Sequence, residues 1–455
     1  MDSLPMSTPR FSFTQDALKT LAAEVLQQAR ALGASDAACE FSEGHALSVT
    51  VRQGSVETIE HNRDKGMGVT VYIGQRRGHA SSSDFSSRAL HDAVKAAYDI
   101  ARFTAEDDCA GLPDAEQLET APPDLDLYHP WALDADHAAQ LAQRAEAAAL
   151  ATSPLIRNSE GASVSANHGQ FVMANTRGFS GGYPYSRHYL SCAPIAGQGK
   201  HMQRDDWYSS ARDHRHMATP EAVGRYAAER ALARLHARSL KTRQVPVLFD
   251  APLAVGLLGS FTQAVSGGAL YRKSSFLLDS LGQAVMAEHL TLKEDPTLRA
   301  ALGSTPFDEE GVKVAPRDVV HDGVLQGYFL SCYSARKLGM QTTGNAGGSH
   351  NLFLTSRHTQ AQDNLPAMLR KLGTGLFVTE LMGQGVNTVT GDYSRGAFGY
   401  WVEGGEICYP VQEITIAGNL KQMLHDITAI GSDVITRGTK NTGSILLSNM
   451  TVAGA

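Results

Sequence analysis

The sequence has no long hydrophobic run and no excess of positive charge, and both absences exclude classes of protein. No apolar stretch in its 455 residues approaches the roughly 18 residues that a membrane-spanning helix needs. Lys and Arg total 40 against 47 for Asp and Glu, a formal net charge of −7. Nucleic-acid-binding proteins usually present a basic face, and membrane-surface proteins carry polybasic clusters. We therefore expect a globular protein with no nucleic-acid partner and no membrane partner.

Cysteine is also scarce, and the five cysteines are widely separated: Cys39, Cys109, Cys192, Cys332 and Cys408. An odd number without any CxxC pair fits free thiols in a reducing compartment better than a disulfide framework. Residues 1–13 have no apolar segment behind a basic start, so no signal peptide is visible. These features predict a cytoplasmic protein.

Several widespread catalytic signatures are absent. The chain has no HExxH, GxGxxG or Walker A motif, which weakens the case for a dinucleotide enzyme or a P-loop NTPase. Ser334–Lys337 matches SxxK, but the companion motifs of penicillin-binding enzymes are missing, so we interpret it as a helix start. His214-Arg215-His216 has chelating spacing on a strand, yet its arginine neighbours favour a solvated polar edge.

The N-terminal region, residues 1–104, has the periodicities of a small α+β domain. A helix is expected between the N-cap Thr14 and the stop Gly33, and a second helix after the N-cap Ser86. Alternating apolar residues predict strands between the two helices. Residues 105–132 hold eight acidic residues and four prolines but no Lys or Arg. We expect them to be an acidic connection, because such a segment resists packing as a helix or strand.

Residues 133–240 predict a middle domain of helices and a strand meander. A helix is expected from Asp136 to Thr152, and short strands between Ile156 and Ala211, where Gly, Ser and Asn are frequent. A last helix is marked by Thr219 as N-cap, followed by proline at the first helical position.

The C-terminal region, residues 241–455, is rich in glycine and carries two strong hairpin signals. These are the two-residue loops Asp322-Gly323 and Gly404-Gly405 between apolar runs. We expect a domain built on a large, mostly antiparallel sheet with helices. The whole chain is therefore predicted to be α+β.

Two segments of this region carry candidate binding residues. His350 follows Gly347-Gly348-Ser349, where the backbone can approach a ligand closely, although a histidine in a turn is the simpler interpretation. Asp392, Tyr393 and Arg395 place a carboxylate, a phenol and a guanidinium between glycines. Such a loop can line a peptide groove or only brace a turn.

Several long blocks of the sequence resemble the TldD/PmbA family, the modulator-of-gyrase peptidases. The blocks are Gly268–Gly282, Glu380–Gly385, Gly391–Gly396 and Glu413–Leu420, and, in the N-terminal region, Gly66–Tyr72 and Ser81–Phe85. They occur in the family's order and extend over nearly the whole chain. The sequence is most similar to the PmbA type, also called TldE.

The resemblance implies a cytoplasmic two-subunit metalloprotease that degrades or trims unfolded and small peptides. In such a heterodimer the TldD-type subunit carries an HExxxH motif and a C-terminal cysteine, which together hold zinc. The TldE-type subunit helps to enclose the substrate chamber. The resemblance therefore implies a TldD-type partner, peptide substrates, and zinc in the partner and not in this chain.

The sequence departs from the TldD type at the metal-binding positions. Where HExxxH is expected, Thr262 and Gly267 stand in place of the histidines and Gln263 in place of the glutamate. A hydroxyl is a poor zinc ligand, glycine offers no side chain, and an amide cannot act as a general base. Gly431–Ser444 contains no cysteine. We therefore expect no catalytic and no metal-binding residues in this chain.

The spacing of the degenerate motif also makes a structural prediction. Positions five residues apart on an ideal helix lie roughly 140° apart, so HExxxH side chains converge only at a bulge or a helix end. The run Ser266-Gly267-Gly268 is expected to mark such a break.

Two alternatives stay open. The chain could be a self-sufficient metallopeptidase with an unrecognised site, for which four histidines are available: His321, His350, His358 and His425. It could also be a non-enzymatic protein that binds peptides without cleaving them. The sequence does not show whether the four histidines converge.

Overall fold

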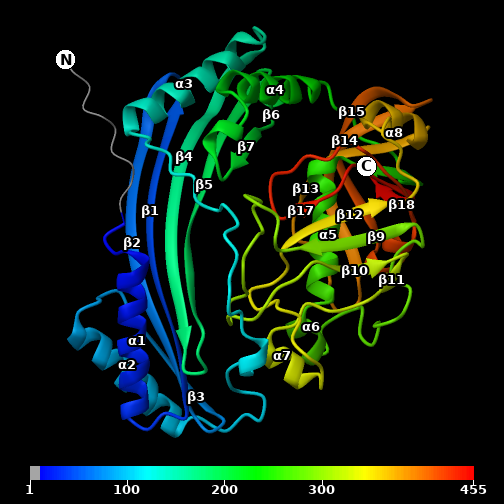
Figure 1. Ribbon diagram of the computed structural model, residues 1–455. Helices are drawn as coiled ribbons and strands as arrows, with labels where there is room; N and C mark the ends of the chain where they lie inside the picture. The colour runs from blue at the N-terminus through cyan, green and yellow to red at the C-terminus, as the bar shows by residue number, and fades with distance from the viewer. Residues whose placement is uncertain (1–10, 455) are drawn as a thin grey trace, which may run out of the picture. The chain divides into compact units, whose positions relative to one another are not determined.

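The computed structural model describes residues 11–454, which form two compact units (Figure 1). The first unit runs to Leu232 and also includes Arg299–Val314. The second consists of Ala233–Leu298 and the chain from Ala315 onward. Both units combine helices with mainly antiparallel sheets, so the predicted α+β class is confirmed. No helix among the described residues is both long and apolar enough to span a membrane.

A single antiparallel sheet forms the centre of the first unit. Its strands in spatial order are β3 (Arg76–Ser82), β2 (Ser55–Ile73), β1 (Asp36–Arg52), β4 (Ile156–Asn175), β5 (Ser180–Ala196) and β6 (Gln203–Arg204), with β7 (Trp207–Ala211) also on β5. Because β1 pairs with β2 on one side and β4 on the other, the expected N-terminal and middle regions share this sheet.

The α-helices of the first unit begin at or within one residue of the predicted positions, and three short 3-10 helices, labelled η, were not predicted. They are α1 (Gln15–Ala31), α2 (Ser87–Phe103), η1 (Ala115–Gln117), α3 (Ala135–Ala151), η2 (Gly199–His201), η3 (His214–His216) and α4 (Pro220–Ala233). Thr14 and Ser86 accept hydrogen bonds as N-caps of α1 and α2, which confirms both predicted starts. Thr219 accepts one from the Ala222 amide at the start of α4.

The predicted short strands of the middle region are wrong in length. The β4 and β5 strands have 20 and 17 residues. The glycines taken as strand ends lie inside these strands. Gly161 has a φ of 114° at a register shift, and a Cβ on Gly182 would lie 2.1 Å from the Phe171 carbonyl oxygen. Glycine here marks a bulge and a close backbone contact within a strand.

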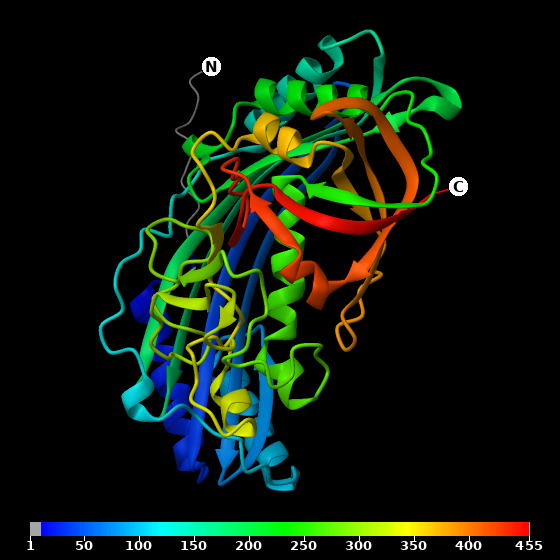
Figure 2. The same ribbon diagram turned by 90° about the vertical axis from the view of Figure 1, so that its right-hand side faces the viewer.

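The two faces of β1 differ sharply in burial, because alternate strand residues point to opposite sides of a sheet. Phe41 and Val49 lie on the face that carries the helices, where α1 and α2 pack at one end and α3 at the other. Glu40 and Ser42 lie on the opposite face and remain accessible. Figures 1 and 2 show α1 and α2 along one side of the long strands. The opposite side of β1 and β2 is therefore an open face.

The second unit contains two sheets. The five-stranded sheet has the order β11 (Val324–Leu325), β10 (Arg317–His321), β9 (Leu290–Asp295), β12 (Asn351–Ser356) and β17 (Lys440–Asn441). The six-stranded sheet has the order β15 (Glu406–Asn419), β14 (Asp392–Glu403), β13 (Gly375–Met382), β8 (Arg243–Phe249), β18 (Ile445–Ala453) and β16 (Ile427–Ile430). The β15 strand also pairs with β18, which closes five of these strands into a ring of pairings. Both hairpins predicted from the two-residue loops are confirmed.

One helix runs through the core of this unit. The core combines apolar residues of both sheets with Leu257, Leu258 and Phe261 of α5 (Ala251–Ala264). The other helices are α6 (Gly267–Tyr271), α7 (Cys332–Lys337), α8 (Leu365–Leu372) and α9 (Leu420–His425). The C-terminal end of α5, where the degenerate motif begins, therefore packs one face against the core, while Gln263 on the other face is exposed.

Candidate functional site

The degenerate HExxxH segment spans a break between two helices. The α5 helix ends at Ala264, and Ser266 is the N-cap of α6, where its hydroxyl accepts a hydrogen bond from the Ala269 amide. The predicted break at this run is confirmed. The backbone still has the interruption that an i, i+5 ligand pair requires.

The side chains at these positions do not fit a zinc ion. The Thr262 hydroxyl donates to the Gly259 carbonyl of its own helix, at 2.9 Å. Gln263 is exposed. Gly267 is buried, and a Cβ placed on it would lie 2.2 Å from the Ser334 Oγ and 2.5 Å from the Ser334 Cβ. No real contact is that short, so the fold excludes a histidine at position 267 unless its surroundings rearrange.

Ser334 is itself held in place. Ser331 and Ser334 form a capping box at the start of α7, in which each side chain bonds the other's backbone amide. The helix start expected at the SxxK match is therefore confirmed, with Ser331 as its N-cap. Across residues 11–454, no group of three or more His, Cys, Asp or Glu side chains is arranged to hold a metal ion.

The four histidines proposed for an unrecognised site occupy separate environments. The His350 Nδ1 lies 3.0 Å from a Glu294 carboxylate oxygen, and the same carboxylate binds Arg317 at 2.8 Å. His321 contacts Asp318 at 2.8 Å. His358 stacks on His289, and His425 ends α9.

The Glu294 network is a buried ion pair. Glu294 is 2% exposed, and hydrogen bonding to His350 with the charge of Arg317 outweighs its burial and lowers its pKa to about 2. Asn345 adds a hydrogen bond to the same carboxylate. His350 therefore braces β9 and β12 in this structure.

The contacts of Asp392, Tyr393 and Arg395 are also internal. Asp392 accepts hydrogen bonds from Thr390 and Asn419, and these bonds lower its pKa. Tyr393 is 3% exposed, and burial raises its pKa to about 12. Arg395 donates to the Met382 carbonyl. The three residues begin β14, in a sheet that does not contain His350, and a role for them in a peptide groove stays a prediction.

Sequence reasoning missed a cluster of buried histidines in the first unit. His45 on β1 lies directly opposite His168 on β4, and the rings of His168 and His188 are 5.3 Å apart. His214 belongs to η3 and not to a strand, and it stacks on Trp131 at 4.7 Å. A signal was present, because His45 and His168 occupy the inward phase of strands, where apolar residues such as Phe41 and Val172 recur.

Burial favours the neutral form of two of these imidazoles, His168 and His188. His168 is 4% exposed, and neither ring nitrogen has a hydrogen-bond partner. Burial, reinforced by the neighbouring His188 and His45, lowers the pKa of His168 to about 4. Burial also lowers the pKa of His188, whose Nε2 donates to the His129 carbonyl. Such a cluster is sensitive to acid.

A pocket of about 720 Å³ lies on the open face of the first unit. Its floor is formed by adjacent strands, where Glu40 pairs with Gly68 on one side and with Met173 on the other. Ser42 pairs with Gly66, one step along the same face. The volume is within the range of small-ligand sites.

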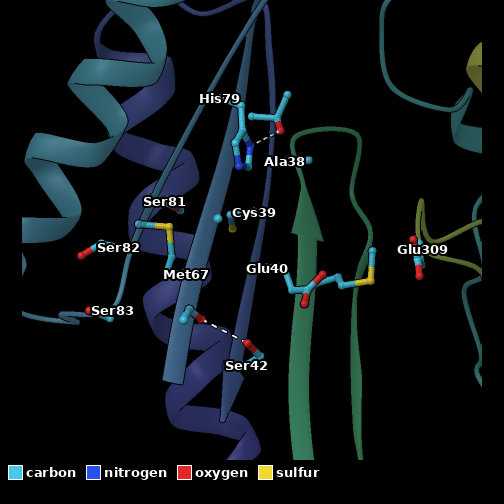
Figure 3. A pocket seen from close by; sticks show the side chains of 14 residues that line it. Ala38, Cys39, Glu40, Ser42, Met67, His79, Ser81, Ser82, Ser83 and Glu309 are labelled. Atoms are coloured by element: carbon cyan, nitrogen blue, oxygen red, sulfur yellow. Dashed lines mark hydrogen bonds between the residues drawn. The ribbon is translucent and has the colours of Figure 1, made fainter. Parts of the chain in front are cut away.

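The walls of this pocket carry hydroxyls and carboxylates together with the His79 ring and Met67. Figure 3 shows Ser81, Ser82 and Ser83 on one side and Glu309, from a separate segment, on the other. The surrounding protein, and then the charge of Glu309, raise the pKa of Glu40 although its side chain is accessible. The pocket therefore concentrates negative charge over a floor that is bare of side chains at Gly66, while the His79 ring lies against Gly68.

Comparison with known families gives one consistent result. Residues 37–101, 128–235 and 242–454 match, in order, domain 1, the central domain and the C-terminal domain of the PmbA/TldA metallopeptidases. Metalloprotease PmbA of Escherichia coli O157:H7 is 48% identical over 425 residues, covering 93% of this chain and 94% of the relative. A Metalloprotease PmbA homolog of Haemophilus influenzae is 44% identical and covers 98% of both chains.

Solved structures share the fold along the whole length. A Bacteroides thetaiotaomicron protein described as a candidate modulator of DNA gyrase has a TM-score of 0.90 at 26% identity, covering 96% of this chain and 99% of that one. TldE from Thermococcus kodakarensis has a TM-score of 0.83 at 18% identity, covering 95% and 100%. At that lower identity the likeness concerns the fold alone.

Proposed function

The chain belongs to the PmbA/TldA metallopeptidase family, and we propose that it is the subunit without a metal site in a two-subunit peptidase. In this proposal a TldD-type paralogue holds the zinc ion and performs the cleavage. This chain completes the chamber and contributes contacts to unfolded or small peptides.

The observation that carries the proposal is the packing of Gly267 against Ser334. A subunit that had merely lost a ligand would keep room for it, but here a serine oxygen occupies the place of a side chain at position 267. Thr262 uses its hydroxyl within its own helix, and Gln263 cannot accept a proton. Three positions depart together from the chemistry that a zinc peptidase needs.

The thiols support a location in the cytoplasm as part of the same proposal. All five cysteines are free thiols. Burial raises the pKa of Cys39 and of Cys192 to about 12, so both are unreactive. Free thiols without disulfides are typical of proteins kept in a reducing compartment.

The test is peptide cleavage by the full chain, alone and co-expressed with a TldD-type paralogue. An unfolded casein fragment serves as the substrate. We expect no cleavage by the chain alone and turnover by the one-to-one complex. Turnover by the chain alone would contradict the proposal and would support a self-sufficient peptidase.

A further inference from the structure

Of the two glycines on the pocket floor, Gly68 packs under the His79 ring, and Gly66 has no structural cause. Gly66 and Gly68 lie inside β2, with unbroken pairing to Ser42 and Glu40, and neither has a positive φ. A Cβ on Gly66 would find its nearest atom, the Ser42 Oγ, at 3.6 Å, which is ordinary contact. On Gly68 it would meet the exposed His79 ring at 3.3 Å.

Glycine weakens a strand interior, so an unforced glycine needs another explanation. Glycine in a strand often marks a bulge, a close backbone contact or a site where a ligand approaches. The regular register excludes a bulge, and the open space at Gly66 excludes a close contact within the unit. Approach of a ligand is the explanation that remains.

The carboxylates indicate the charge of this ligand. Neither Glu40 nor Glu309 forms an ion pair with a Lys or Arg side chain in the part of the chain that the structure describes. The two like charges oppose one another across the pocket. A cation between them would remove this repulsion and gain charge-assisted hydrogen bonds.

The rest of the lining indicates the shape of the ligand. Met173, next to Glu40 across the strands, and the bare backbone at Gly66 form a weakly polar floor that suits an aliphatic stem. Hydroxyls of Ser42 and Ser81 lie beside it as acceptors. A flexible apolar stem with a cationic end is the structure of a lysine or arginine side chain.

We propose that this pocket binds a lysine or arginine side chain of an extended peptide, with the cation between Glu40 and Glu309 and the stem over Gly66. The volume of about 720 Å³ leaves room for the flanking peptide backbone. The inference rests on the proposed function, since it assigns peptides as the source of the cation. It gives this subunit a preference for basic peptides that is independent of the partner's zinc.

The test is binding of fluorescent peptides to the full chain without its partner. The probe is an unstructured Ser/Ala peptide with one central arginine, and its control carries citrulline, which has nearly the same shape without charge. We expect the citrulline peptide to bind at least about tenfold more weakly than the arginine peptide, because it loses a charge-assisted hydrogen bond. Equal binding of the two peptides would overturn the proposal.

Variants locate the site. Glu40→Gln should weaken binding of the arginine peptide by about tenfold and leave binding of the citrulline peptide unchanged. Gly66→Val should weaken both peptides, because its side chain fills the floor. The matched control is Glu60→Gln. Glu60 is an exposed carboxylate on β2, the strand of Gly66, but lies outside the pocket, so its substitution should leave the binding of both peptides unchanged. Unaltered binding in Glu40→Gln would contradict the assignment.

A competition arm distinguishes peptides from small cations. Acetylarginine amide and spermidine carry the same chemistry without a peptide chain, and we expect both to compete only weakly. Competition as strong as that of the peptide itself would overturn the peptide source. Because binding is measured without the partner and cleavage with it, either result can fail while the other stands.

Discussion

The Ser334 side chain occupies the space beside Gly267 that any side chain at that position would need, since a Cβ there would lie 2.2 Å from its Oγ. The contact joins the start of α6 to the capping box of α7. It makes the loss of the second metal-binding position part of the packing, so restoring one residue does not restore a site.

Rebuilding the motif should therefore fail. The variant Thr262→His, Gln263→Glu, Gly267→His is expected to bind no stoichiometric zinc and to lose about 1–3 kcal/mol of stability through overpacking at position 267. Metal analysis and urea unfolding measure the two effects. The double variant that leaves Gly267 unchanged should keep nearly all its stability. A well-folded triple variant holding one zinc ion would refute the account of this contact.

We expect His350 to stabilise the fold and not to take part in peptide cleavage. We expect His350→Ala to lower the free energy of unfolding by about 1–3 kcal/mol, because it leaves the buried Glu294 carboxylate with one partner fewer. Turnover by the folded complex with the TldD-type partner should persist. Abolished turnover with intact folding would instead favour a metal site that includes this histidine.

The Glu294–Arg317 pair should dominate the stability of the five-stranded sheet. Arg317→Met leaves a buried carboxylate without its cation, and such a loss typically costs about 3–5 kcal/mol. Urea unfolding measures it. Arg357→Met removes an exposed pair with Glu288 and should cost less than about 1 kcal/mol. Equal effects of the two substitutions would show that the buried network is weaker than its geometry implies.

The histidine cluster should make the first unit sensitive to acid. The pKa of His168 is about 4 in the folded chain, below the unfolded value of about 6.5. Below pH 6.5 the unfolded chain binds more protons, so stability is fully present above pH 6.5 and falls as the pH drops toward 4.

Removing one histidine should reduce the dependence of the free energy of unfolding on pH. His168→Phe should lose less stability between pH 7 and pH 5 than the natural chain does, by up to about 1.4 kcal/mol per pH unit. Urea unfolding at several pH values measures the slope. His61→Gln, at an exposed histidine, should leave it unchanged. An unchanged slope in His168→Phe would contradict the role of this cluster.

Gly66 offers a test that separates function from folding. Gly66→Ala should raise stability by about 0.5–1 kcal/mol, since alanine loses less backbone entropy than glycine in a strand and the added Cβ makes only ordinary contact. Thermal unfolding measures this gain. Gly182→Ala, where a Cβ would lie 2.1 Å from a carbonyl oxygen, should destabilise the same sheet. Destabilisation by Gly66→Ala would show that the glycine serves the fold.

The sequence predicts local structure well where short-range chemistry decides it. Thr14 and Ser86 cap helices as their hydroxyls suggest, and the Gly404-Gly405 hairpin forms. These features depend on a few neighbouring residues. The helix break in the degenerate motif was predictable for the same reason.

Contacts between strands that are distant in the chain could not be predicted from the sequence. Pairing of His45 with His168 joins residues 123 positions apart in numbering, and nothing local indicates that register. The pocket likewise needs Glu40, Gly68 and Glu309 from separate segments. The strands of the meander were predicted too short, because a glycine in the sequence can mark either a turn that ends a strand or a bulge within one.

The most direct test of the central claim is the zinc content of the purified full chain, alone and in complex with a TldD-type paralogue. The account predicts no bound zinc in the chain alone and one zinc ion per heterodimer. Stoichiometric zinc in the chain alone would contradict it.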